Sequence, residues 1–176
     1  MTVVRKIAVT GPESTGKSWL TRHLAGYYQT AYVPEYAREY IEQLGREYVQ
    51  DDITRIAKGQ LSAEYEAMKN ARGLLFCDTE LIVTKIWSLH KYGSCDPWIP
   101  GQITNNPYDL VLLCDVDMPW EPDPQREHPH LRSFFFDWFL RELNAYGFPY
   151  RIIRGRGEER LNNAIKAVDD HISETG

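Results

Sequence analysis

The chain has 176 residues, which is the size of one compact domain. Apolar residues make up 43% of it and charged residues 26%, which is typical of a globular protein and excludes a disordered or fibrous chain. The formal net charge of -5 leaves no cationic surplus, so we expect no nucleic acid as the main partner. No apolar run is long enough to cross a bilayer and no signal peptide is evident, so we expect no membrane partner and a soluble, cytoplasmic protein.

A strand, a glycine-rich segment and a helix are predicted at the start of the chain. Residues 3–10 are typical of a buried strand, and Leu20, Leu24 and Tyr27 recur at helical spacing after it. Between them, residues 11–18 read Gly-Pro-Glu-Ser-Thr-Gly-Lys-Ser, which matches the phosphate-binding P-loop pattern G-x-x-x-x-G-K-S. The flanking strand and helix are the context that this motif requires, and they disfavour the alternative of a glycine-rich turn with a chance lysine.

The P-loop predicts a nucleotide site built mainly from backbone donors. Gly11 and Gly16 permit geometry that other residues rarely adopt, so successive N–H groups can point at phosphate oxygens. The first turn of the following helix adds the positive end of its dipole. Near the other end of the chain, Gly155 follows a predicted strand, where a turn could approach an adenine edge or simply join strand to helix. The predicted nucleotide-binding residues are Gly11, Glu13, Ser14, Thr15, Gly16, Lys17, Ser18 and Gly155.

Three side chains at and near the P-loop predict ATP and Mg²⁺ as cofactors. Lys17 can reach the β- and γ-phosphates, and the hydroxyl of Ser18 is a hard oxygen ligand that suits Mg²⁺. Asp78 ends an apolar strand over residues 74–77, the place from which P-loop enzymes hold Mg²⁺ through water or accept a proton. Asp78 could instead cap the next helix, and both roles could coexist.

Glu35 is a candidate proton acceptor. It follows a short strand over residues 31–33 and would project towards the edge of the sheet where ligands of open α/β sheets bind. A carboxylate there could take the proton from an attacking hydroxyl. The alternative is an exposed glutamate favoured by the dipole of the following helix. Arg38, three residues further on, is either a substrate contact or a surface cation.

Residues 115–130, which we name the lid loop, contain four prolines that preclude regular helix or sheet. A long irregular segment inside a compact domain favours a functional lid over a solvated loop. Phosphoryl transfer needs positive charge on the transferring group and exclusion of water, and a lid that carries arginines supplies both. Arg126 in the lid loop and Arg132 after it are therefore predicted catalytic residues.

The remaining segments alternate between helical and strand-like patterns. A helix is predicted with one apolar face over residues 40–48, and further helices are predicted from Asp51 to about Gly73 and around residues 82–89, 131–143 and 161–172. Strands are predicted at residues 109–114 and 150–153. Residues 93–107 are predicted to be an irregular connection. This alternation predicts one α/β domain over residues 1–176, a P-loop fold of the nucleoside and nucleotide kinase type. Its five-stranded parallel sheet would have helices on both faces.

Four further segments carry a resemblance to a known family. They are Val-Pro-Glu-Tyr-Ala-Arg-Glu-Tyr at 33–40, Asp-Thr-Glu-Leu-Ile-Val-Thr-Lys-Ile-Trp at 78–87, Pro-Trp-Glu-Pro-Asp-Pro-Gln-Arg at 119–126 and Gly-Phe-Pro-Tyr at 147–150. Together with the P-loop they resemble the ribosylnicotinamide kinase domain of the bifunctional bacterial NMN adenylyltransferase and ribosylnicotinamide kinase family. The resemblance spans nearly the whole chain.

The resemblance implies a reaction and roles for particular residues. The reaction is ATP-dependent phosphorylation of nicotinamide riboside at its 5′-hydroxyl, which gives nicotinamide mononucleotide for NAD synthesis. Glu35 would accept the proton and Asp78 would hold magnesium, with these two roles open to exchange, while Arg126 and Arg132 would be the lid cations. The sequence starts directly at the kinase strand, so no adenylyltransferase activity is carried over.

Two alternatives to this function remain open. One is a P-loop ATPase that acts as a nucleotide-dependent regulatory switch, and the other is a kinase for another nucleoside or coenzyme precursor. A GTPase is disfavoured because the sequence lacks an N-K-x-D guanine motif. The sequence does not predict the oligomeric state.

Overall fold

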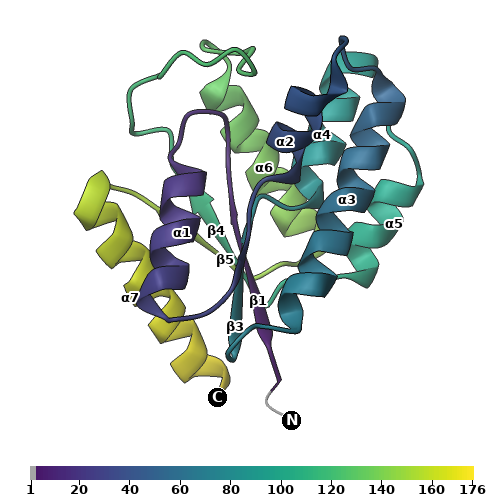
Figure 1. The fold of residues 1–176 in the computed structure, drawn as a ribbon. Helices are drawn as coiled ribbons and strands as arrows, with labels where there is room; N and C mark the ends of the chain where they lie inside the picture. The colour runs from purple at the N-terminus through teal and green to yellow at the C-terminus, as the bar shows by residue number, and fades with distance from the viewer. Residues whose placement is uncertain (1–2) are drawn as a thin grey trace.

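The computed structural model describes residues 3–176, in which a five-stranded sheet lies between two layers of helices (Figure 1). The strand order is β2-β3-β1-β4-β5, and the pairs β2·β3, β3·β1, β1·β4 and β4·β5 are all parallel. β3 and β4 are buried at every position, as central parallel strands covered on both faces require. The predicted fold class is confirmed. The strands are β1 (Arg5–Thr10), β2 (Tyr32–Val33), β3 (Leu74–Asp78), β4 (Leu110–Cys114) and β5 (Tyr150–Ile153).

The helices divide between the two faces of the sheet (Figure 1). One face is covered by α1 (Lys17–Tyr27) and α7 (Gly157–Thr175), whose buried apolar residues form one core cluster with the sheet. The second core cluster joins the other face of the sheet to four helices. These four are α3 (Gln50–Met68), α4 (Leu81–Tyr92), α5 (Trp98–Asn105) and α6 (Arg132–Tyr146). The helix α2 (Tyr36–Leu44) packs against α3, which is one of these four.

Residues 93–107, predicted as an irregular connection, contain helix α5. The prediction was wrong, since two prolines of this segment lie where a helix tolerates them. Pro97 is the N-cap and Pro100 lies in the first turn, where a missing N–H removes no bond of the helix. Ile99 and Ile103 then lie on one side of the helix, four residues apart, and both are buried.

The boundary between α2 and α3 also differs from the prediction. Residues 40–48 do not lie on one helix, because Gly45 takes a left-handed conformation with φ 66° and ends α2. Asp51, the predicted start of α3, lies inside the helix, because α3 begins at Gln50 and its N-cap is Val49. The side chain of Asp52 instead accepts a hydrogen bond from the backbone N–H of Val49 at 2.8 Å, and this bond secures the first turn. The end of α3 precedes Gly73, the predicted limit, by a short turn.

The parallel sheet gathers the segments that follow β1, β2 and β3 at its carboxyl edge. The P-loop follows β1, Glu35 lies just beyond β2, and Asp78 ends β3. The sheet therefore brings together the candidate residues that the sequence places far apart. Of the helices between residues 3 and 176, none combines the length and apolar character that a membrane span needs.

Candidate active site

The P-loop joins β1 to α1 through a turn in which three residues have positive φ. These are Gly11 at 139°, Ser14 at 57° and Gly16 at 76°. At Gly11 a side chain would be excluded, because a Cβ atom there would lie 2.9 Å from the carbonyl oxygen of Cys114. The hydroxyl of Thr15 closes the turn by donating to another carbonyl of the loop at 2.8 Å. Alternation of left-handed and right-handed residues is the geometry that turns backbone N–H groups into an anion-binding nest.

Lys17 is the first residue of α1, and its side chain folds back over the P-loop. Its ammonium group donates to the carbonyl oxygens of Gly11 at 2.9 Å and Pro12 at 2.8 Å. The positive charge therefore lies beside the backbone nest, where phosphate oxygens would meet both. The contact of Lys17 with the β- and γ-phosphates stays a prediction.

The exposed residue Ser18 and the buried residue Asp78 form a hydrogen-bonded pair next to the P-loop. The hydroxyl of Ser18 donates to Oδ2 of Asp78 at 2.5 Å, and Oδ1 of Asp78 has no hydrogen-bond partner within residues 3–176. Burial raises the pKa of Asp78 to about 6, and the negative charge of Glu35 adds to the effect. The helix cap that the sequence offered as an alternative role for Asp78 is supplied by Glu80 instead. The unpaired buried oxygen beside a hydroxyl is a site that suits a hard cation.

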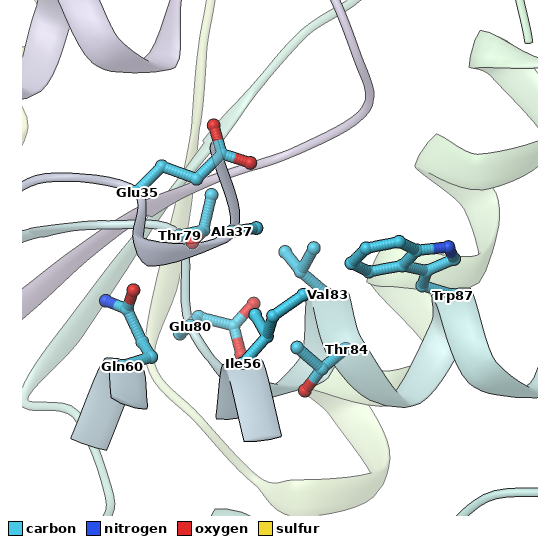
Figure 2. A pocket seen from close by; sticks show the side chains of 9 residues that line it. All are labelled: Glu35, Ala37, Ile56, Gln60, Thr79, Glu80, Val83, Thr84 and Trp87. Carbon is cyan, nitrogen blue, oxygen red and sulfur yellow. The ribbon is translucent and has the colours of Figure 1, made fainter. Parts of the chain in front are cut away.

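Glu35 occupies the N-cap position of α2, half-buried and close enough to Asp78 to raise its pKa. It lies between two hollows, since it borders both a wide cleft and a small cavity of about 40 Å³ between α2, α3 and α4. Figure 2 shows the small cavity, with the carboxylate of Glu35 turned away from the side chains of Gln60 and Glu80. The carboxylate is thus available to the cleft.

The wide cleft has a volume of about 930 Å³, at the upper end of the range for small-molecule sites. The P-loop and a group of aromatic side chains both line it. This group, which we name the aromatic wall, consists of Tyr48, Trp87, His90, Phe135 and Phe139. Aromatic faces of this kind bind flat or cationic rings. The cleft is therefore large enough and suitably lined for a nucleotide tail and a second, ring-bearing molecule.

The lid loop lies over the P-loop at the same end of the sheet (Figure 1). The backbone N–H of Glu121 donates to Oγ of Ser14 at 2.9 Å. Arg126 reaches the same hydroxyl at 3.4 Å, and Arg132 donates to the carbonyl oxygen of Ser14 at 3.2 Å. Both predicted lid cations are thus directed at the P-loop. Arg132 also holds the lid loop itself through the carbonyl of Met118 at 2.7 Å.

Two residues predicted to bind the nucleotide make contacts within the protein, and their binding of the nucleotide stays a prediction. The carboxylate of Glu13 accepts hydrogen bonds from the backbone N–H groups of Glu127 at 3.2 Å and His128 at 3.1 Å. Glu13 therefore fastens the P-loop to the lid loop. The backbone N–H of Gly155 donates to Asp117 at 2.7 Å, so the contact of Gly155 with adenine stays a prediction.

Several residues around the site were not identified from the sequence. Glu80 is fully buried and caps α4, accepting from Ile82 N–H at 2.5 Å and from the hydroxyl of Thr10 at 2.9 Å. Burial raises its pKa to about 7. A carboxylate directly before an apolar helical pattern is a signal that could have indicated this cap.

Tyr48 is a second residue that the sequence did not single out. Its hydroxyl accepts from Nε1 of Trp87 at 3.0 Å and from Nζ of Lys91 at 2.5 Å, and it donates to the carboxylate of Glu127 at 2.9 Å. The aromatic wall is thereby connected to the lid loop. Only the three-dimensional arrangement could show this, because the four residues come from three separate segments.

The sheet, the P-loop nest and the adjacent lysine define a P-loop nucleotide-binding protein. A family model described as an AAA domain matches residues 6–160, and the chain belongs to this family.

Curated relatives indicate a narrower relationship. The chain is 32% identical over 129 residues to the trifunctional NAD biosynthesis/regulator protein NadR of Escherichia coli K12, and 31% identical over 129 residues to the NadR protein of Salmonella typhimurium LT2. Each match covers 70% of this chain but only 31% of the relative. The match therefore concerns about a third of each relative's length.

Solved structures agree with the sequence relatives. A NadR protein in complex with NAD and AMP-PNP superposes with a TM-score of 0.78 at 27% identity, covering 96% of this chain and 49% of that one. A NadR protein in complex with NR gives the same TM-score at 26% identity, covering 96% and 51%. A deoxyadenosine kinase from M. mycoides, at 15% identity and a TM-score of 0.68, shows the shared fold alone, covering 94% of this chain and 99% of that one.

Proposed function

We propose that this domain transfers the γ-phosphoryl group of ATP to the 5′-hydroxyl of nicotinamide riboside. The observation that carries the proposal is that one cleft contains the P-loop with Lys17, the half-buried carboxylate of Glu35, and the aromatic wall. A triphosphate at the P-loop and a pyridinium ring at the aromatic wall would place the ribose near Glu35. The similarity to NadR proteins solved with NR and with AMP-PNP supports both ligands.

We assign the binding of Mg²⁺ to Ser18 and Asp78. The residues fit the ion, because the free Oδ1 of Asp78 and the hydroxyl of Ser18 are hard oxygen donors next to the P-loop. No cluster of three or more His, Cys, Asp or Glu side chains able to hold a metal occurs in the described chain. Mg²⁺ needs none, since it is commonly bound by one or two protein oxygens together with phosphates and water. When bound, it would neutralise charge on the phosphates.

The other residues have separate roles in this proposal. Lys17 and the backbone nest bind the β- and γ-phosphates. Glu35 accepts the proton of the attacking hydroxyl as the new O–P bond forms and the bond from the γ-phosphorus to the bridging oxygen breaks. Arg126 and Arg132 place positive charge over the P-loop, and the lid loop that carries or adjoins them excludes water.

A regulatory ATPase is the second candidate, because the curated relatives are described as regulators as well as biosynthetic proteins. The cleft favours the kinase, since a switch that only hydrolyses ATP has no need of the aromatic wall that lines the same cleft as the P-loop. A kinase for another nucleoside differs only in the ring that this wall accepts.

An acceptor panel distinguishes these functions. ADP release from ATP and Mg²⁺ is measured with nicotinamide riboside, with other nucleosides and without acceptor. We expect release to depend on nicotinamide riboside, and equal release without any acceptor would contradict the kinase. Lys17→Ala is the control for contaminating activity: it should lower turnover at least a hundredfold while the circular dichroism spectrum stays unchanged, because it removes charge from the transferring group without removing a core contact.

A further inference from the structure

A fully buried arginine of α7 connects three loops at the nucleotide end of the sheet. Arg160 is 1% exposed, although arginine is rarely buried. Its guanidinium donates to the carbonyl oxygens of Gly155 at 2.7 Å and Thr15 at 3.1 Å, and it forms an ion pair with Asp117. These partners belong to the turn before α7, to the P-loop and to the lid loop, respectively.

The bond to Thr15 fixes the orientation of one peptide group in the P-loop. The C=O and N–H groups of a trans peptide point in opposite directions, and residues 3–176 contain no cis peptide. Because the carbonyl of Thr15 points at Arg160, the N–H of Gly16 in the same peptide plane points away from Arg160. A donor held in this way needs no reorganisation when an anion binds.

Asp117 completes the arrangement with a single carboxylate. Its Oδ1 pairs with Arg160, and its Oδ2 accepts from the backbone N–H of Gly155 at 2.7 Å. A buried guanidinium needs hydrogen-bond acceptors around it, and Asp117 supplies one that also carries the opposite charge. The P-loop, the base of the lid loop and the turn before α7 are thus held together by one ion pair.

We propose that Arg160 is a positioning residue for the nucleotide. It holds the Thr15–Gly16 peptide with its N–H ready for a phosphate oxygen, and it ties the P-loop to the base of the lid loop. Arg160 does not contact the reacting atoms. The inference rests on the proposed function only in taking ATP as the nucleotide.

The test compares ATP binding in three variants by calorimetry. Arg160→Met should raise the dissociation constant for ATP about tenfold, and Asp117→Asn about threefold, because an oriented donor is lost or loosened. Arg154→Gln is the matched control. Arg154 also pairs with the base of the lid loop, through Asp115 at 2.8 Å, but its side chain is 67% exposed and we expect unchanged ATP binding.

Affinity for the acceptor separates positioning from general damage. The dissociation constant for nicotinamide riboside, measured by the same calorimetry, should stay within about twofold of wild type in Arg160→Met and in Asp117→Asn. Unchanged ATP affinity in a folded Arg160→Met variant would overturn the inference, and so would an equal loss of affinity for ATP and acceptor. Should Arg160→Met fail to fold, Asp117→Asn decides alone by the same two criteria. Calorimetry detects ATP binding even in a protein that transfers no phosphoryl group, so this test and the test of the proposed function can fail separately.

Discussion

Glu35 and Asp78 are two carboxylates with different surroundings, and the difference supports their separate roles. Asp78 is 2% exposed, and burial raises its pKa to about 6. A buried carboxylate is stabilised in its charged form by a cation, which suits a metal ligand. Glu35 is half-buried at the cleft, where an acceptor hydroxyl can reach it. The alternative of exchanged roles is testable at the level of single residues.

Glu35→Gln should slow the chemical step while sparing nucleotide binding. Loss of a general base costs about a hundredfold or more in rate, whereas the P-loop contacts that bind ATP remain. Rapid-quench measurement of a single turnover gives the rate, and calorimetry gives the ATP dissociation constant, which should stay within about twofold. An unchanged single-turnover rate would assign the base to Asp78.

The raised pKa of Asp78 predicts an acidic limb in the pH profile. Asp78 is ionised above pH 6 and becomes protonated as the pH falls through that value, so kcat/KM should decline below about pH 6. Because Mg²⁺ binds the ionised form, a higher Mg²⁺ concentration should shift the midpoint of this limb to lower pH. Profiles at two Mg²⁺ concentrations check this. A midpoint that does not change with the Mg²⁺ concentration would contradict the assignment of Asp78 as the ligand.

Among the elements, the turn between α2 and α3 depends on one buried carboxylate. Asp52 is fully buried in the first turn of α3 and accepts from Arg46 at 2.8 and 3.0 Å, from the hydroxyl of Tyr40 at 2.7 Å and from the N–H of Val49. The turn that it holds carries Tyr48, which contacts Trp87 of the aromatic wall and Glu127 of the lid loop. A contact inside one helix terminus thus supports a wall of the cleft.

Asp52→Ala should lower the free energy of unfolding by about 1–2 kcal/mol at pH 7, because it leaves several donors without their acceptor. The hydrogen bonds from Arg46 hold the pKa of Asp52 well below its usual range. A depressed pKa stabilises the folded state above the unfolded value of about 4, and that contribution is lost as the pH falls further. The difference between variant and wild type should therefore shrink below pH 4 in denaturant titrations.

The matched control is Glu66→Ala on the same helix. Glu66 pairs with Lys69 at 2.7 Å, but both side chains are more than half exposed, so the change should be within about 0.5 kcal/mol. An Asp52→Ala variant as stable as this control would contradict the role of the turn.

For the whole molecule, local patterns predicted the sheet and the P-loop because both follow from neighbouring residues. The two-sided apolar runs indicated central strands, and the spacing of Gly11, Gly16 and Lys17 indicated the nest. The positive φ of Ser14 was not predicted, because in a sequence it is glycine that indicates this geometry. The role of Arg160 was not predicted, because its partner Thr15 lies 145 residues away in sequence and the two residues come into contact only in the folded chain.

The central claim concerns the whole reaction, and ³¹P NMR of the mixture tests it most directly. The purified protein is incubated with ATP, Mg²⁺ and nicotinamide riboside, with Lys17→Ala in a parallel sample. We predict that the γ-phosphate resonance of ATP disappears while a phosphomonoester resonance with the shift of nicotinamide mononucleotide grows by an equal amount. We predict this change for the wild-type protein only. Release of inorganic phosphate in place of the monoester, or no loss of the γ-phosphate resonance, would contradict the account.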